Sequence, residues 1–350
     1  MPGMIPRPAG GLAELSPSNF GMVMATGIIS LAAQDLGLGP LARALFHLNL
    51  GFYLVLCALT VTRAARHPHR FFGDMVDHRA APGYFTAVAG TSLLAGQFLV
   101  LNADVATATA LALLALALWL LLTYAVFAGL TISARKPALQ DGISGAWLLA
   151  VVATQSLAVI AALLAPSADA ATRQVMHFLA LAVWLWGGML YIWIAALIFY
   201  RYCFFPLAPE DLSPSYWINM GAMAISTLAG SLLLANAPGT PLLESMTPFI
   251  KGFTLFCWAA GTWWIPLQLI LSVWRYAWRG SRIRYEPLCW GVVFPLGMYA
   301  ASTWQMAHAF ELGFLDAVPP TFLGLALLAW LLAASGLVSR LARQLRVSVA

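Results

Sequence analysis

Residues 106–132 of the chain read ATATALALLALALWLLLTYAVFAGLTI, a run of 27 residues without a charge. The hydrocarbon core of a bilayer is about 30 Å thick, and a helix needs about 20 apolar residues to cross it. This run is therefore long enough to span a membrane as one helix. The rest of the chain has the same character, because 61% of its residues are hydrophobic and 9% are charged. Soluble domains carry about 25% charged residues, so the composition predicts an integral membrane protein.

Ten long apolar stretches follow one another, and we expect an all-α fold of ten transmembrane helices arranged as five hairpins around a central pore. The expected helices form a single transmembrane domain over residues 1–350 and cover 18–36, 41–62, 82–101, 106–132, 143–166, 174–200, 215–235, 248–276, 286–308 and 318–340. Residues 1–18 are rich in Pro and Gly without a continuous apolar core, so no cleavable signal peptide is expected.

Basic residues are distributed unequally between the two sides of this topology. Fifteen lie on the side of both termini, and three, Arg43, Arg173 and Lys251, lie on the other, whereas the acidic residues divide seven to six. An excess of Lys and Arg marks the cytoplasmic side of a membrane protein. We therefore expect a multi-pass protein of a bacterial-type inner membrane with both termini in the cytoplasm. Its basic residues flank helix ends beside the lipid bilayer and form no single stripe, so no nucleic-acid partner is expected.

The odd-numbered helices of this order differ from the even-numbered ones. They begin at intervals of about 64, 61, 72 and 71 residues and carry most of the polar uncharged residues and many of the glycines. We interpret them as an inner layer around a path and the even helices as an outer layer against lipid. The alternative is close packing, since small and hydroxyl residues also mediate helix contacts in membranes. The pore-lining candidates are Thr26, Gly27, Thr86, Gly90, Thr154, Gly221, Ser226 and Gly297.

The most specific local signal is WGVVFPLG at residues 290–297. Pro295 inside a helix removes a backbone hydrogen bond and favours a kink. Beside it, Phe294 can lie across a narrow conduit, and a hydrophobic constriction of this kind gates by excluding water. The alternative is a core phenylalanine next to a packing kink.

Three segments carry a resemblance to a known family. NFGMVMATGIIS at residues 19–30 resembles the first helix of the tellurite-resistance/C4-dicarboxylate transporter family, WLLAVVAT at 147–154 resembles its fifth helix, and Trp290, Phe294 and Pro295 match its ninth. The family includes bacterial tellurite-resistance channels, fungal malate and sulfite transporters and plant slow anion channels. Ala150 stands where the family often has a proline in the fifth helix.

The resemblance implies a homotrimer in which each protomer has its own pore, lined by the five odd helices and occluded by Phe294. Its partners would be small inorganic or organic anions. We therefore predict an anion channel or a passive anion transporter. The alternatives are a proton-coupled C4-dicarboxylate carrier for malate or succinate, a sulfite or tellurite efflux transporter, and a structural or sensory membrane protein without transport.

No enzyme, cofactor or metal is expected. The four cysteines are scattered without metal-ligand spacing, and His67, His69 and His78 read as part of a solvated loop. The tryptophans of the sixth and eighth expected helices are typical of interfacial anchors or subunit contacts. They are Trp184, Trp186, Trp193, Trp263 and Trp264.

Overall fold

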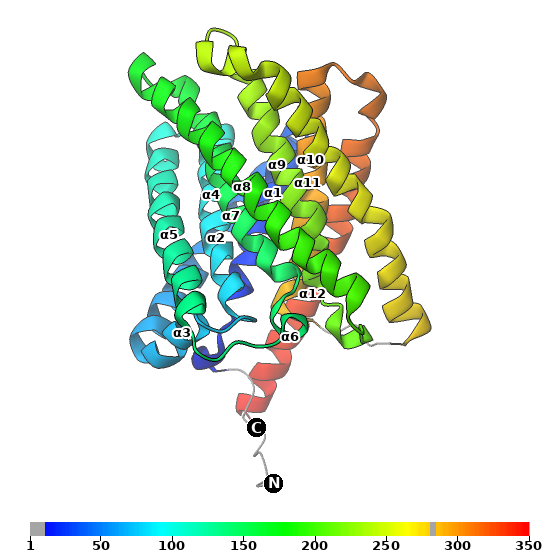
Figure 1. The fold of residues 1–350 in the computed structure, drawn as a ribbon. Coiled ribbons are helices and arrows are strands. Elements are labelled where there is room, and N and C mark those ends of the chain that lie inside the picture. Colours follow the sequence, from blue (N-terminus) through cyan, green and yellow to red (C-terminus); the bar gives the residue numbers. More distant parts are fainter. Residues whose placement is uncertain (1–10, 281–284, 350) are drawn as a thin grey trace.

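The computed structural model of the chain describes residues 11–280 and 285–349 and has the form of a helical bundle (Figure 1). Its long helices are α1 Gly21–Asp35, α2 Gly39–Arg66, α4 Phe85–Asn102, α5 Val105–Ile132, α7 Leu149–Leu164, α8 Ala170–Phe204, α9 Ile218–Ala235, α10 Pro241–Val273, α11 Trp290–Phe310 and α12 Val318–Val349. Short helices α3 Pro68–Asp74 and α6 Leu139–Gly142 lie at the end of the bundle where the described chain begins and where α12 ends, which we call the termini end (Figure 1). Arg7, Arg282 and Arg284, which contribute to the predicted charge asymmetry, lie outside the described residues.

Eight helical segments within the described part of the chain are long and apolar enough to cross a membrane. The all-α membrane fold is thereby confirmed, and the number of ten crossings stays a prediction. The two remaining long helices are α1 and α11. Helix α1 has 15 residues, which at 1.5 Å per residue span about 22 Å, less than the hydrocarbon core of about 30 Å. Helix α11 contains the polar residues Gln305 and His308 near its end.

The bundle has an inner and an outer layer, as the distribution of polar residues predicted. In the most apolar stretches of α4, α7 and α9, 72%, 89% and 89% of the residues are buried. In those of α2, α5, α8, α10 and α12, only 17% to 39% of the residues are buried. Neighbouring inner helices pack together in the order α1, α4, α7, α9, α11 and back to α1. The inner layer is therefore a closed ring, in which the first helix of the chain contacts the second-last.

Each outer helix is also bonded to the inner helix of the next hairpin. We call these contacts the five cross-layer bonds. Four of them run from an indole N–H to an oxygen, and the fifth joins two hydroxyls. They pair Tyr53 with Thr91, Trp119 with Thr154, Trp184 with the Ser226 carbonyl, Trp258 with Thr303, and Trp330 with Thr26, at 2.8–3.0 Å. An indole N–H inside a bilayer has no water to bond, so an acceptor on a neighbouring helix stabilises the packing.

Two of the tryptophans predicted at the lipid interface or at subunit contacts are buried in the protomer, so that prediction was wrong for them. Trp184 is fully buried and belongs to the cross-layer bonds, and Trp264 is 5% exposed and donates to the Tyr191 hydroxyl at 2.7 Å. Trp186, Trp193 and Trp263 are exposed on the outer layer.

Two buried arginines attach the connecting segments at the termini end. Arg63 of α2 pairs with Asp74 and donates to the Ala13 carbonyl at 3.3 Å. Arg201 of α8 pairs with Asp211 at 3.2 Å and donates to the Gln140 carbonyl at 2.9 Å. A buried guanidinium needs such partners to offset its lost hydration, so these contacts fix how the loops lie around the ring.

Candidate functional site: a mouth and a closed axis

All five inner helices begin at the termini end with a turn of 3₁₀ helix. These turns are Pro17–Phe20, Ala81–Tyr84, Gly145–Leu148, Pro214–Trp217 and Pro287–Cys289. Four of them have proline in their first two positions, where its missing N–H removes no helical hydrogen bond. The turns contact one another in the same cyclic order as the helices. They form a ring around the axis of the bundle, which we call the axial mouth.

Two glycines allow the turns of the axial mouth to approach closely. A Cβ atom on Gly145 would lie 2.3 Å from the carbonyl oxygen of Ser215, and one on Gly83 would lie 2.9 Å from the backbone nitrogen of Ser18. Backbone atoms cannot move aside as a flexible side chain can. Thr86 adds a bond between two turns, because its hydroxyl is within 3.0 Å of the Pro17 carbonyl and 2.7 Å of the Gly83 carbonyl.

The axial mouth encloses a small cavity of about 20 Å³. Every inner helix contributes to its lining, and one residue from each forms a first layer: Gly21, Thr86, Leu149, Ile218 and Gly291. Met24 and Phe294 also reach this cavity. The lining residues carry no charged side chain, so the field at the mouth comes from the backbone and from more distant groups.

Phe294 belongs to the next layer along the axis. Three residues complete most of a helical turn and return to the same face, so the first layer is followed by a second made of Met24, Ala89, Val152, Gly221 and Phe294. Phe294 is 1% exposed. It is the one ring in a layer that also contains an alanine and a glycine.

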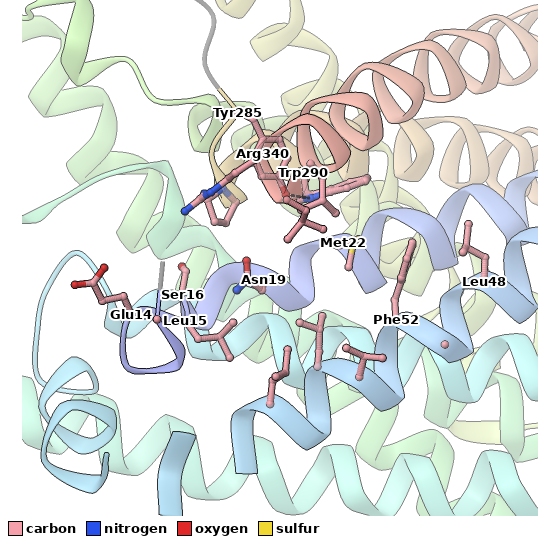
Figure 2. A pocket seen from close by; sticks show the side chains of 18 of the residues that line it. Glu14, Leu15, Ser16, Asn19, Met22, Leu48, Phe52, Tyr285, Trp290 and Arg340 are labelled. Carbon is pink, nitrogen blue, oxygen red and sulfur yellow. Dashed lines mark hydrogen bonds between the residues drawn. The ribbon is translucent and has the colours of Figure 1, made fainter. Parts of the chain in front are cut away.

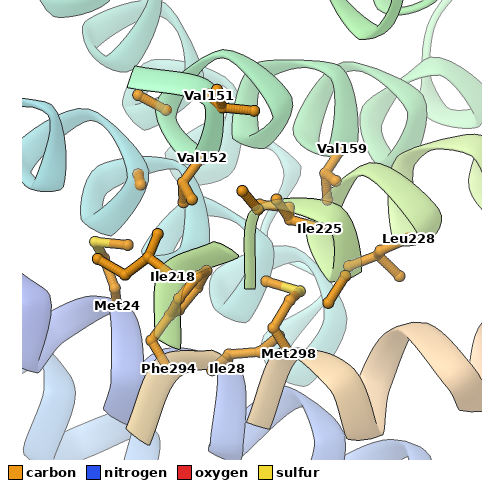
Figure 3. Packing of buried hydrophobic residues seen from close by; sticks show 14 of the residues in the cluster. Met24, Ile28, Val151, Val152, Val159, Ile218, Ile225, Leu228, Phe294 and Met298 are labelled. Carbon is orange, nitrogen blue, oxygen red and sulfur yellow. The ribbon is translucent and has the colours of Figure 1, made fainter. Parts of the chain in front are cut away.

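Beyond Phe294 the axis remains filled by apolar side chains. Figure 3 shows Ile28, Ile225 and Met298 converging from α1, α9 and α11, and each is fully buried. Sequence reasoning missed these residues, since an apolar residue on an apolar helix carries no signal of which face is axial. The axis is therefore closed in this structure over more than one layer.

Close contacts hold α11 in the orientation that aims Phe294 inward. A Cβ atom on Gly221 would lie 2.8 Å from Cγ and 3.2 Å from Cα of Pro295. On the other side of α11, a Cβ atom on Gly297 would lie 3.0 Å from Ile28. Pro295 lies inside the continuous helix α11, where the carbonyl of Gly291 loses its usual donor.

The structure brings Thr86, Gly221, Phe294 and Pro295 together around the first two layers. The other candidates contact neighbouring helices. Thr26 and Thr154 accept cross-layer bonds, as does the carbonyl of Ser226, while Gly27 lies against Asn49 and Gln97, Gly90 against Val23, and Gly297 against Ile28 and Ile29. Their role in lining a pore stays a prediction.

A larger cavity of about 790 Å³ opens at the side of the bundle between α1, α2 and α12 (Figure 2). Its walls are mostly apolar, with Glu14, Asn19 and Arg340 among the polar exceptions. Trp290 and Pro287 line both this cavity and the cavity of the axial mouth. They therefore form the partition between the lateral cavity and the axis.

Comparison with known proteins identifies the family. A model of the voltage-dependent anion channel family matches residues 14–338. An uncharacterized membrane protein of Mycobacterium tuberculosis is 34% identical over 141 residues, which are 40% of this chain and 71% of the relative. An uncharacterized transporter of Methanocaldococcus jannaschii is 21% identical over 87% of this chain and 88% of its own length.

A sulfite efflux pump of the fungus Arthroderma benhamiae is 21% identical over 92% of this chain and 89% of its own length. The resemblance stated from the sequence is thus confirmed. The matched family is one of anion channels and transporters and not of enzymes, and its members are multi-pass membrane proteins. The match covers nearly the whole chain, which therefore belongs to the voltage-dependent anion channel family.

Proposed function

We propose that the chain conducts small anions passively along the axis of its inner ring and that Phe294 closes this path. The observation that carries the proposal is the position of Phe294, an aromatic ring in a layer with Ala89 and Gly221, next to the cavity of the axial mouth. A narrow apolar constriction excludes water and ions until its side chains move aside. The closed axis is then the resting state of a gate.

The arrangement of the inner helices supports a preference for anions. All five have their N-terminal ends at the axial mouth, and each helix N-terminus carries a partial positive charge of about half a unit. Five such ends around one small cavity attract a negative ion without any basic side chain. The first two layers contain no carboxylate that would favour a cation.

The same two layers contain no titratable side chain, which favours a passive conduit over a coupled one. Proton coupling normally uses an ionisable group within the membrane. A proton-coupled carrier for malate or succinate is the alternative, and a carrier of this kind could take its proton with the substrate. The relation to a sulfite efflux pump makes sulfite the first anion to test.

The test is anion current through the purified protein in planar bilayers. We expect a small wild-type current that rises at least tenfold in Phe294→Ala and reverses at the anion equilibrium potential, because the mutation empties the second layer. The matched control is Phe85→Ala, which removes an equally buried ring (2% exposed) that packs toward Phe127 of α5.

A Phe294→Ala current no larger than that of Phe85→Ala would contradict the gate. A current in neither variant, together with sulfite or C4-acid uptake that stops when the proton gradient is collapsed, would favour the coupled carrier instead.

We further propose a homotrimer in the inner membrane with the termini end in the cytoplasm, as the family resemblance and the charge asymmetry imply. Cys203 is exposed near the termini end of α8. A membrane-impermeant maleimide should label it in inverted vesicles and not in intact spheroplasts. The mass of the detergent-free particle in nanodiscs tests the trimer.

A further inference from the structure

A third cavity lies between the turn that precedes α9, the end of α10 and the start of α11, away from the axis. Its volume is about 220 Å³, and it is lined by Leu212, Ser213, Pro214, Trp217, Gln268, Leu271, Ser272, Arg275, Tyr276 and Val292. Val292 and Phe294 are two residues apart and so point about 200° apart around α11. The cavity therefore lies on the opposite side of α11 from Phe294 and is separate from the axial mouth.

Two buried hydrogen-bond donors on residues that line this cavity are incompletely satisfied. The Gln268 side chain is 2% exposed, and its Nε2 has the Tyr202 hydroxyl beside it but no acceptor at full hydrogen-bond distance. The Nε of Arg275 is also buried and makes none. Buried donors are nearly always satisfied, and each one left unpaired is costly. An acceptor that reaches both would remove that cost.

The surroundings of the two donors select a negatively charged acceptor. The cavity lining contains one guanidinium, two serine hydroxyls and no carboxylate. The nearest acidic residue along the chain, Asp211, is already bonded to Arg201 and to the backbone N–H of Ala208. The Arg275 guanidinium lies 5.0 Å from the centre of the Tyr276 ring, a contact with its face that leaves the in-plane N–H groups available.

The backbone at this point is also unusual. Residues Trp274–Trp278 form a π-helix that continues α10, and π-helical turns are found mostly at functional sites. Side chains on a helix lean toward its N-terminus, so Arg275 extends toward Gln268, two turns earlier. Both residues line the same cavity.

From these observations we propose that this cavity is a second anion site, off the conduction path, that takes a small oxyanion such as sulfate or sulfite between Gln268 and Arg275. The volume suffices for a tetrahedral oxyanion with a few waters, since a water molecule occupies about 30 Å³ in the liquid. Arg and amide N–H groups match oxyanion oxygens in charge and geometry. The proposal does not depend on whether the axis conducts.

The test is calorimetric titration of the purified full-length protein with sodium sulfate at constant ionic strength. We expect Arg275→Gln and Gln268→Leu each to weaken sulfate binding at least about tenfold, the loss of one charge-assisted hydrogen bond. The matched control is Arg279→Gln, which removes an exposed charge from the same end of α10, and it should change the affinity less than about twofold.

A second variant covers the case in which these replacements impair folding. Gln268→Glu keeps the size of the side chain and supplies a carboxylate beside Arg275. It should abolish sulfate binding and raise the melting temperature, because the built-in carboxylate replaces the ion. A Gln268→Glu protein that melts lower and binds sulfate normally would overturn the proposal, as would equal losses in Arg275→Gln and Arg279→Gln.

A lipid phosphate has the same chemistry as a free oxyanion, and nanodiscs distinguish the two. We expect sulfate to bind equally in discs of phosphatidylcholine alone and in discs containing phosphatidylglycerol. If Arg275-dependent sulfate binding is lost only in the discs that contain phosphatidylglycerol, the occupant of the cavity is a lipid headgroup and not a free ion.

Discussion

At the scale of single residues, the contact between Gly221 and Pro295 offers a direct test of how α9 and α11 fit together. We predict that Gly221→Ala destabilises the protein by about 1–3 kcal/mol, the usual range for an overpacked core. The added Cβ atom would lie 2.8 Å from Cγ and 3.2 Å from Cα of Pro295, and a proline ring has no rotamer that moves it away. Thermal unfolding in detergent measures the loss.

Gly252→Ala is the matched control for this prediction. Gly252 is also inside a long helix, α10, and a Cβ atom there would meet nothing within 4 Å. Alanine is the better helix former by about 1 kcal/mol, so this variant should be neutral or more stable. If both replacements shift the melting temperature equally, the close contact with Pro295 is not the cause.

The residues of the inner layer also show how much of the fold could be predicted from the sequence. The hydroxyls on the odd helices predicted an inner layer, and this was right. Their contacts, however, include bonds to outer helices that composition alone does not reveal, as with Thr154 and Trp119. Trp184 was assigned to an interface because a tryptophan on an apolar helix has no local signal for its partner. A tryptophan recurs on the outer helix of four of the five hairpins, at positions 119, 184, 258 and 330, with Tyr53 in the first, and this recurrence is a signal that could have found it.

At the scale of the elements, the cross-layer bonds predict a measurable coupling between outer and inner helices. In a double-mutant cycle of Trp119→Phe and Thr154→Val, we expect a coupling free energy of about 0.6–1.7 kcal/mol, the range for hydrogen bonds between membrane helices. Both partners are nearly fully buried and their atoms are 2.9 Å apart. Unfolding in mixed micelles gives the four free energies.

The control cycle pairs Thr154→Val with Trp193→Phe. Trp193 is 59% exposed on α8, and this pair should show no coupling within error. A coupling as large as that of the first cycle would mean that the loss reflects general loosening of the bundle and not a specific bond between α5 and α7.

The 3₁₀ turns that begin the inner helices could be predicted in part from the sequence, since Pro17, Pro82, Pro214 and Pro287 recur at the start of four of the five hairpins. Proline is favoured in the first turn of a helix. The sequence did not predict that these turns assemble into one mouth. That assembly depends on contacts such as the one between Gly145 and Ser215, two residues that are 70 positions apart in the chain. Likewise α10 begins at Pro241 and continues through Pro248 and Pro266, whereas local proline signals predicted a start at 248.

At the scale of the whole molecule, α12 covers the contact between α11 and α1 that closes the inner ring, and we predict that a separate chain can supply this cover. Residues 1–316 and 317–350, expressed together, should co-purify, because α12 packs on both α11 and α1. The fragment 1–316 alone should melt at lower temperature and be cut faster by protease.

Trp330→Phe in the shorter fragment provides the control, since it removes the bond to Thr26 but keeps the apolar face. We expect this variant to co-purify less well with fragment 1–316. Leu331→Ala, at a lipid-facing position that is 60% exposed, should co-purify as well as the unchanged fragment. A fragment 1–316 that is as stable as the full chain would show that α12 is dispensable for the ring.

The bond from Trp330 to Thr26 joins residues 304 positions apart, and this has a consequence for how the protein is made. Membrane helices enter the bilayer in chain order, and N-terminal segments fold first during synthesis. Until the segment around residue 330 has been made and inserted, the contact between α1 and α11 that closes the inner ring lacks its outer cover. A chain that stops before this segment would leave the Thr26 hydroxyl without its indole partner, on a face turned toward lipid. Completion of synthesis thus decides whether the last contact of the ring is covered by protein or by the bilayer.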